Sequence, residues 1–115
     1  MRELQTGSKK HTKVVALDDK KFGANHFYLV ASVADSSPLT EIKFQTGPIK
    51  ENGVNGCHNE DLIAIIIDRL NDFQATDFKC RENALAITKL EETLHWLSHR
   101  TLDREKRGVE GTHQK

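Results

Sequence analysis

The sequence has little of what marks several classes of protein. Its 115 residues include two cysteines, Cys57 and Cys80, which are too few for a dense disulfide framework. The longest apolar run, the six residues from Leu62 to Ile67, is far shorter than the roughly 20 residues that a membrane span needs. The first residues also lack the apolar stretch of a signal peptide. We therefore expect a cytosolic protein with no membrane partner.

An excess of charge of either sign is also missing, because 17 lysines and arginines balance 17 aspartates and glutamates. Histone-like and ribosomal proteins need a large basic excess to neutralise phosphates, so we expect no DNA partner. The charge is nevertheless uneven along the chain. Residues 59–92 carry four basic and eight acidic residues, whereas residues 93–115 carry five basic and three acidic residues. A small basic cluster on a neutral protein favours a compact anionic partner.

The motifs of the common catalytic sites are absent. There is no Gly-x-Ser-x-Gly, no phosphate-binding loop and no glycine-rich dinucleotide fingerprint. His95 and His99 have metal-ligand spacing, but Trp96 stands where a zincin has glutamate. The second helical segment lacks the repeated carboxylates that would hold magnesium in a nucleotide pyrophosphohydrolase. We expect no metal, no cofactor and no enzymatic activity, with a small helical nucleotide pyrophosphohydrolase as the alternative.

The patterning predicts an α+β fold, a small N-terminal antiparallel β-sheet followed by a long antiparallel αα-hairpin. Residues 1–12 are polar and are expected to form a flexible arm, followed by a single domain over residues 13–115. Two strand-like stretches within residues 26–45 flank a Ser-Pro turn and predict a β-hairpin. Glycine and asparagine are frequent in residues 46–58, which predicts a structured loop.

Helical spacing of apolar residues predicts one helix over residues 59–74 and a second over residues 78–102, followed by a tail over residues 103–115. Asn59 is a plausible N-cap of the first helix. So short a connection between the helices requires antiparallel packing. The apolar face of the first helix is too broad to be hidden by one neighbour, which predicts an oligomer.

Several polar and aromatic residues are candidates for binding an anionic nucleotide. Arg100 and Arg104 share one helix face with Arg107 one turn further on, and guanidinium groups suit phosphate oxygens. These arginines could equally complement the helix dipole and the acidic stretch. The amide of Asn83 suits a base edge or a ribose hydroxyl. Phe73 could stack on a base or could belong to the core.

An ordered set of motifs resembles the phage Thoeris anti-defence sponge family over roughly residues 26–113. The motifs are Ile42-Lys43-Phe44-Gln45-x-Gly47-Pro48-Ile49-Lys50-Glu51, Gly53-Val54-Asn55-Gly56, Glu60-Asp61-Leu62, Asp68-Arg69-Leu70-x-x-Phe73-Gln74, Cys80-Arg81-Glu82-Asn83-Ala84, Thr88-Lys89-Leu90-Glu91-Glu92, Trp96-Leu97, Arg100-Thr101, Arg104, Arg107 and Gly108-Val109-Glu110-Gly111-Thr112-His113.

The resemblance implies a phage protein without catalytic activity that acts in the host bacterial cytoplasm. Such proteins sequester glycocyclic ADP-ribose and related cyclic ADP-ribose isomers made by TIR-domain enzymes, so that the NAD-depleting effector is not triggered. The helical hairpin is similar to that of the anti-CBASS sponges. Some members also bind cyclic di- and trinucleotides in a second pocket of a hexamer, which makes these signals and a homo-hexamer expectations here.

The resemblance also implies roles for individual residues, with the ligand held between protomers near the tail. A module that binds nucleic acid or protein through the basic tail is a further alternative. The implied roles are stacking on the adenine for Phe73, a hydrogen bond to base or ribose for Asn83, clamping of the pyrophosphate for Arg100 and Arg104, closure of the tail for Arg107, Thr112 and His113, and the second pocket for Lys50.

Overall fold

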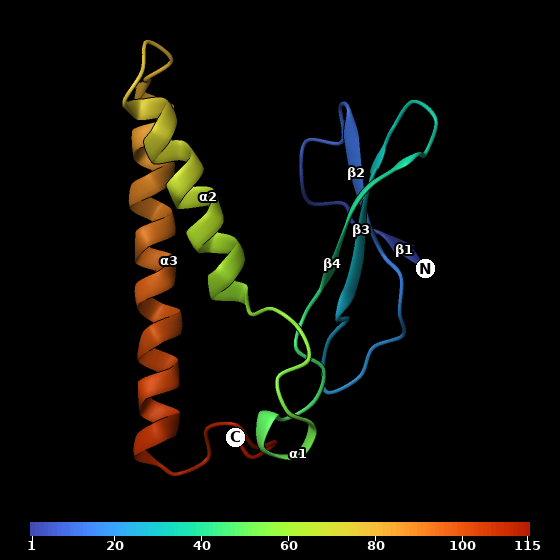
Figure 1. Cartoon of the computed structure of the whole chain (residues 1–115), viewed down its shortest axis with the longest axis vertical. Helices are drawn as coiled ribbons and strands as arrows, with labels where there is room; N and C mark the ends of the chain where they lie inside the picture. Colours follow the sequence, from blue (N-terminus) through green and yellow to red (C-terminus); the bar gives the residue numbers. More distant parts are fainter. The chain divides into compact units, whose positions relative to one another are not determined.

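The computed structural model describes all 115 residues, which form two compact units (Figure 1). The first unit, Met1–Cys57, carries a four-stranded antiparallel sheet, and the second, His58–Lys115, carries two long helices. The predicted α+β class, with a small sheet followed by an αα-hairpin, is confirmed. The single domain over residues 13–115 stays a prediction, and within it the chain divides into its two compact units after Cys57.

The sheet has the strand order β1-β2-β3-β4, with β1 at Arg2–Glu3, β2 at Thr12–Ala16, β3 at Phe27–Ser32 and β4 at Pro38–Lys43. The predicted β-hairpin within residues 26–45 is β3 and β4, paired antiparallel with a register irregularity between Val30 and Ala31. Successive strands are neighbours in the sheet, which follows from their short connections.

The structure differs from the predicted flexible arm, because Arg2 and Glu3 form the edge strand β1. The Arg2 guanidinium donates to Asn25 Oδ1 at 2.7 Å, and Asn25 Nδ2 donates to the Asp18 carbonyl at 2.6 Å. The Asp18 carboxylate in turn accepts the His26 backbone N–H at 3.0 Å. These contacts join residues distant in sequence, so local composition could not predict them.

Two side-chain amides organise the loop between β4 and the helical unit. Gln45 Nε2 donates to the Gly53 carbonyl at 2.7 Å, and Gln45 Oε1 accepts the Asn55 N–H at 3.0 Å. Asn55 Oδ1 accepts the Thr46 N–H at 2.8 Å. The predicted loop over residues 46–58 is therefore ordered, and it also contains a helical turn, α1, at Ile49–Asn52.

Gly56 makes the closest backbone approach in this loop. A Cβ atom at this position would overlap the backbone carbonyl of Phe44. We expect Gly56→Ala to lower the free energy of unfolding by about 2–3 kcal/mol, because neither backbone segment can yield freely. Urea denaturation would measure this, with Val54→Ala as the control in the same loop. Val54 is 73% exposed, so its truncation should change stability by less than about 0.5 kcal/mol. Equal midpoints for the two variants would contradict the expectation.

The two helices are α2 at Asn59–Gln74 and α3 at Arg81–Lys106. The cap of α2 is His58 instead of the predicted Asn59: the Asp61 N–H donates to the His58 carbonyl at 3.0 Å, and the Asp61 carboxylate accepts the His58 N–H at 2.8 Å. The second helix begins after Cys80, whose sulfur accepts the Asn83 N–H at 3.4 Å. It therefore begins and ends later than the predicted residues 78–102. Neither helix is long and apolar enough to cross a membrane.

Few side chains of the single chain are buried. The buried apolar residues are Ala16 and Ala31, α2 has no buried residue, and the buried residue of α3 is Arg104. A chain of this length ordinarily buries more apolar surface, and exposed apolar patches mark protein contacts. The large apolar residues exposed on the helical unit are Ile65, Ile66, Phe78, Leu85, Trp96 and Leu102.

Candidate ligand-binding site

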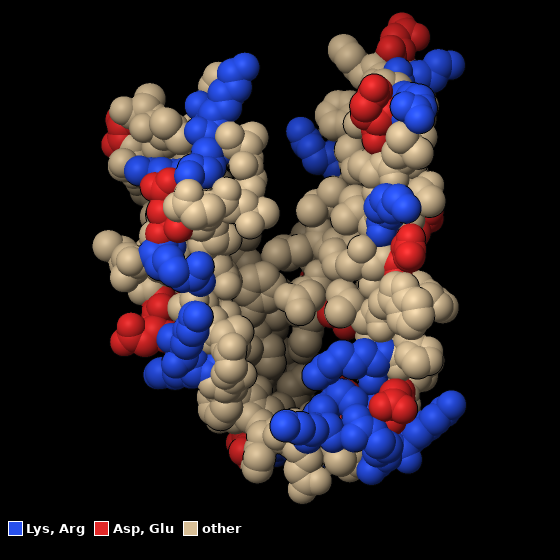
Figure 2. All heavy atoms as spheres, turned by 180° about the vertical axis from the view of Figure 1, so that it is seen from behind, with Lys and Arg blue, Asp and Glu red and all other residues tan.

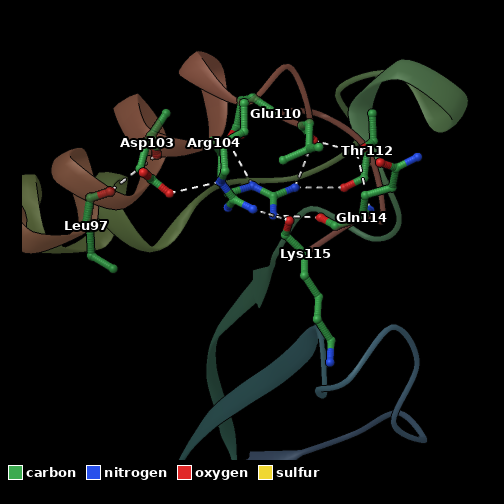
Figure 3. A network of polar contacts seen from close by, with 10 residues as sticks. Leu97, Asp103, Arg104, Glu110, Thr112, Gln114 and Lys115 are labelled. Carbon is green, nitrogen blue, oxygen red and sulfur yellow. Dashed lines mark hydrogen bonds and ion pairs between the residues drawn. The ribbon is translucent and has the colours of Figure 1, made fainter.

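The end of α3 is organised around the side chain of Arg104, which is only 8% exposed (Figure 3). Its Nε donates to Glu110 Oε2 at 3.1 Å, and its Nη1 donates to the Gln114 carbonyl at 2.7 Å. Its Nη2 donates to the carbonyls of Val109 and Thr112, at 2.9 and 3.0 Å. Four hydrogen bonds therefore fix the tail to one guanidinium.

The turn that ends α3 explains why the tail meets this arginine. Gly108 has a φ of 74°, its N–H donates to the Glu105 carbonyl at 3.1 Å, and the Val109 N–H donates to the Arg104 carbonyl at 3.0 Å. This is the Schellman pattern, in which glycine reverses the chain beyond a helix. The reversal brings the tail carbonyls back over the last turns of α3. The Arg104 guanidinium is thus occupied by protein acceptors in this structure, and the clamp stays a prediction.

Arg100 lies one turn before Arg104 and is in a different state. Its side chain is exposed, and its guanidinium has no hydrogen bond or ion pair within the chain. Arg107 is exposed but engaged, since its Nε donates to Asp103 Oδ2 at 3.1 Å and its Nη1 donates to the Lys115 carbonyl at 2.6 Å. Of the three predicted arginines, Arg100 is the one whose donors are available to an anion. Figure 2 shows Lys and Arg side chains gathered where α3 ends.

The tail that follows α3 carries two more of the predicted ligand-binding residues. Thr112 is half-buried, its N–H donates to the Val109 carbonyl at 3.1 Å, and its own carbonyl is an acceptor of Arg104. His113, the next residue, is exposed. We call Arg100, Arg104, Arg107, Thr112 and His113 the tail cluster.

Phe73 and Asn83, which we call the tip cluster, lie at the opposite end of the hairpin. Phe73 is half-buried near the end of α2, with the Arg69 guanidinium 5.2 Å from its ring centroid. Asn83 is half-buried in the first turn of α3. Both residues flank the connection between the helices, so one chain brings them to the same end of the hairpin.

The tip and tail clusters are far apart within one chain. Asn83 and Arg100 belong to the same helix, and the helical rise between them is about 25 Å. Such a distance exceeds what a ligand the size of cyclic ADP-ribose spans. The residues predicted to share one ligand are therefore split into two groups by the straight path of α3.

The helical hairpin matches a known protein family. Residues 37–101 match the family described as Acb2/Tad1, hairpin domain. Over an alignment of 144 positions the chain is 44% identical to Thoeris anti-defense 1 of Bacillus phage SBSphiJ7, with 100% of both sequences covered. The chain belongs to the Acb2/Tad1 hairpin family. The predicted resemblance to the phage Thoeris anti-defence sponges is confirmed.

The matched hairpin segment of the Acb2/Tad1 family includes the tip cluster and Arg100 but ends before Arg104. Arg104 and the tail belong to the part of the chain covered by the full-length relative alone. Lys50, predicted for a second pocket, is exposed on α1 within the sheet unit.

The structure also shows the surroundings of the two histidines with metal-ligand spacing and of the two cysteines. His95 and His99 both place their rings edge-on to Trp96, with centroids 5.7 and 5.9 Å away. No three His, Cys, Asp or Glu side chains of the chain form a group that could hold a metal ion. Cys57 and Cys80 are free and belong to different units.

The structure adds residues that sequence reasoning did not assign. Glu110 is the ionic partner of Arg104, and its place in the Gly108–Thr112 motif was the available signal. Arg69 and Phe78 both contact the Phe73 ring. The signal for Phe78 is an aromatic residue in a short, mostly polar connection, but the predicted second helix, over residues 78–102, begins at this residue.

Proposed function

We propose that this member of the Acb2/Tad1 hairpin family is a phage anti-defence protein of the host bacterial cytoplasm that sequesters cyclic ADP-ribose-type signals without degrading them. The observation that carries the proposal is the full-length similarity to Thoeris anti-defense 1. The hairpin supports it, because Phe73 and Asn83 and the unpaired Arg100 offer an aromatic ring, an amide and a free guanidinium. These groups suit adenine, ribose and pyrophosphate and need no metal or general base.

The ligand we propose first is glycocyclic ADP-ribose. Phe73 stacks on its adenine, Asn83 hydrogen-bonds base or ribose, and Arg100 binds the pyrophosphate. Arg104 does not contact the ligand but holds the tail in place. The tail residues Thr112 and His113 then close over the pyrophosphate together with Arg107. This role of Arg104 replaces the direct clamp, because its four hydrogen bonds leave little of the guanidinium for a ligand.

Two protomers are needed to build this site. The tip and tail clusters are about 25 Å apart along α3, so we propose that the tip of one hairpin meets the tail of another related by a two-fold axis. The uncovered apolar residues of the helices, such as Ile65, Ile66 and Trp96, supply surface for the contact. This supports a homo-oligomer, and a hexamer is the assembly we propose.

A second pocket for cyclic di- and trinucleotides is part of the proposal, with Lys50 as its candidate residue. Silencing a signal also requires sites in excess and a dissociation constant in roughly the nanomolar range, about −12 kcal/mol. Burial of the ligand between two chains makes such affinity easier, because both supply walls.

Titration calorimetry with glycocyclic ADP-ribose, followed by heating and chromatography of the released nucleotide, tests the proposal. We expect tight binding, recovery of intact ligand and a weak dependence of affinity on salt. A degraded product would instead indicate the nucleotide pyrophosphohydrolase. Binding to nucleic acid with a steep loss of affinity in salt would indicate the interaction module. Absence of binding to glycocyclic ADP-ribose and to cyclic di- and trinucleotides would overturn the proposal.

A further inference from the structure

The connection between α2 and α3 presents a second aromatic ring beside Phe73. Phe78 is 75% exposed, although it is a large apolar side chain. Its ring centroid lies 6.5 Å from that of Phe73, and the two ring planes meet at 84°. The two phenyl rings therefore form an open corner at the tip of the hairpin.

Hydrogen bonds fix the backbone that carries this corner. The Phe78 N–H donates to Thr76 Oγ1 at 3.1 Å, and Thr76 Oγ1 donates to the Phe73 carbonyl at 2.7 Å. The Gln74 amide pairs with both backbone groups of Cys80, at 2.9 and 3.0 Å. Phe78 is thus carried by a turn with several hydrogen bonds, so its exposure is a feature of the fold and not of a loose loop.

Arg69 restricts how a ligand can approach Phe73. Its guanidinium lies over the Phe73 ring, 5.2 Å from the centroid, which is a cation–π distance. A base that stacks on Phe73 has to use the face that Arg69 leaves open. The Phe73 ring therefore contacts both a cation and a perpendicular phenyl ring, and both constrain the position of a base.

We propose that Phe78, with Phe73, forms the adenine subsite of this protein, and that Arg69 positions the Phe73 ring. The inference rests on the proposed function and extends it by a specificity-determining residue. An aromatic ring prefers to meet another in an offset stack or edge to face, so a corner of two perpendicular rings can offer a base both contacts at once. A purine, with its two fused rings, reaches both walls better than a pyrimidine does.

Phe78→Leu tests the subsite in the full-length protein with glycocyclic ADP-ribose as the probe. We expect calorimetry to show affinity weaker by roughly three- to tenfold, the size of one aromatic contact. In proton NMR the adenine H2 and H8 resonances should shift upfield less on binding than with the wild type. Phe78→Trp, which retains a ring, should restore most of the affinity and of the shift. Phe22→Leu removes a phenyl ring of similar exposure, 64%, from the sheet unit and should change neither.

The outcomes separate this inference from the proposed function. Wild-type affinity and an unchanged upfield shift in Phe78→Leu would overturn the subsite and leave sequestration intact. Weaker binding together with a smaller oligomer in light scattering would also overturn it, because Phe78 would then contact a second protein chain. No binding by the wild type would remove the proposed function, and the subsite with it.

Discussion

Replacement of Arg104 by alanine is expected to release the C-terminal tail and to weaken binding of glycocyclic ADP-ribose by at least about 100-fold. The reason is the concentration of tail contacts on one side chain: the guanidinium binds Glu110 and the carbonyls of Val109, Thr112 and Gln114. Hydrogen bonds to charged groups are worth more than neutral ones, so we also expect a loss of about 2–3 kcal/mol in stability. The hairpin itself should stay folded and oligomeric.

Digestion with an endoproteinase specific for glutamate would report the state of the tail directly. Glu110 is partly shielded, and its carboxylate is held 3.1 Å from Arg104 Nε, so wild-type cleavage there should be slow. Cleavage after Glu110 should accelerate in Arg104→Ala, and calorimetry on the same sample gives the affinity. Arg104→Lys is the matched variant, because it retains the charge but not the planar fork that reaches four acceptors. It should release the tail nearly as much.

The same pair of readouts distinguishes the two roles of Arg104. A protected tail with lost binding would show that the arginine contacts the ligand itself, as the family resemblance implied. A protected tail with unchanged binding would contradict both roles. Glu110→Gln should give an intermediate result, because three carbonyl contacts of Arg104 remain while the ion pair is lost.

Residue spacing predicted the elements whose side chains repeat regularly. The strands within residues 26–45 and the helix over residues 59–74 both follow from such repeats, and their observed bounds agree with the prediction. It did not predict β1, because two edge residues are held by distant partners such as Asn25. It also missed α1, a single turn within a loop held by the amides of Gln45 and Asn55.

The candidate site shows the same limit at the level of single residues. Residue spacing correctly predicted that Arg100 and Arg104 lie on neighbouring turns of one helix. It did not predict that one is exposed and the other buried. Arg104 is buried because the chain reverses at Gly108 and returns the tail over it, whereas Arg100 has no such cover. The helix predicted over residues 59–74 likewise places Phe73 near the connection between the two helices. The contact between the Phe73 and Phe78 rings, however, depends on the hydrogen bonds of Thr76. Both details follow from the way the chain reverses direction.

Mixing two inactive variants is expected to restore ligand capture. Phe73→Ala removes the base platform and Arg100→Ala the free guanidinium, so each variant alone should bind glycocyclic ADP-ribose at least about 100-fold more weakly than the wild type. If tip and tail come from different protomers, a mixed pair has one site with both residues intact and one with neither. Random mixing of equal amounts should therefore restore about a quarter of the wild-type sites before selection, and about half of the sites within each mixed pair.

Co-expression with two affinity tags and successive purification would isolate the mixed oligomers, and calorimetric stoichiometry would count their active sites. The control carries both substitutions in one protomer and is co-expressed with wild type. A mixed pair of that kind has one impaired residue in each shared site, so the mixed pairs themselves should have no intact site.

A site contained within one protomer would reverse the two results: the complementing variants would stay inactive, and the doubly substituted chain would leave its wild-type partner's site working. Because α3 holds Asn83 and Arg100 about 25 Å apart, we expect the shared arrangement.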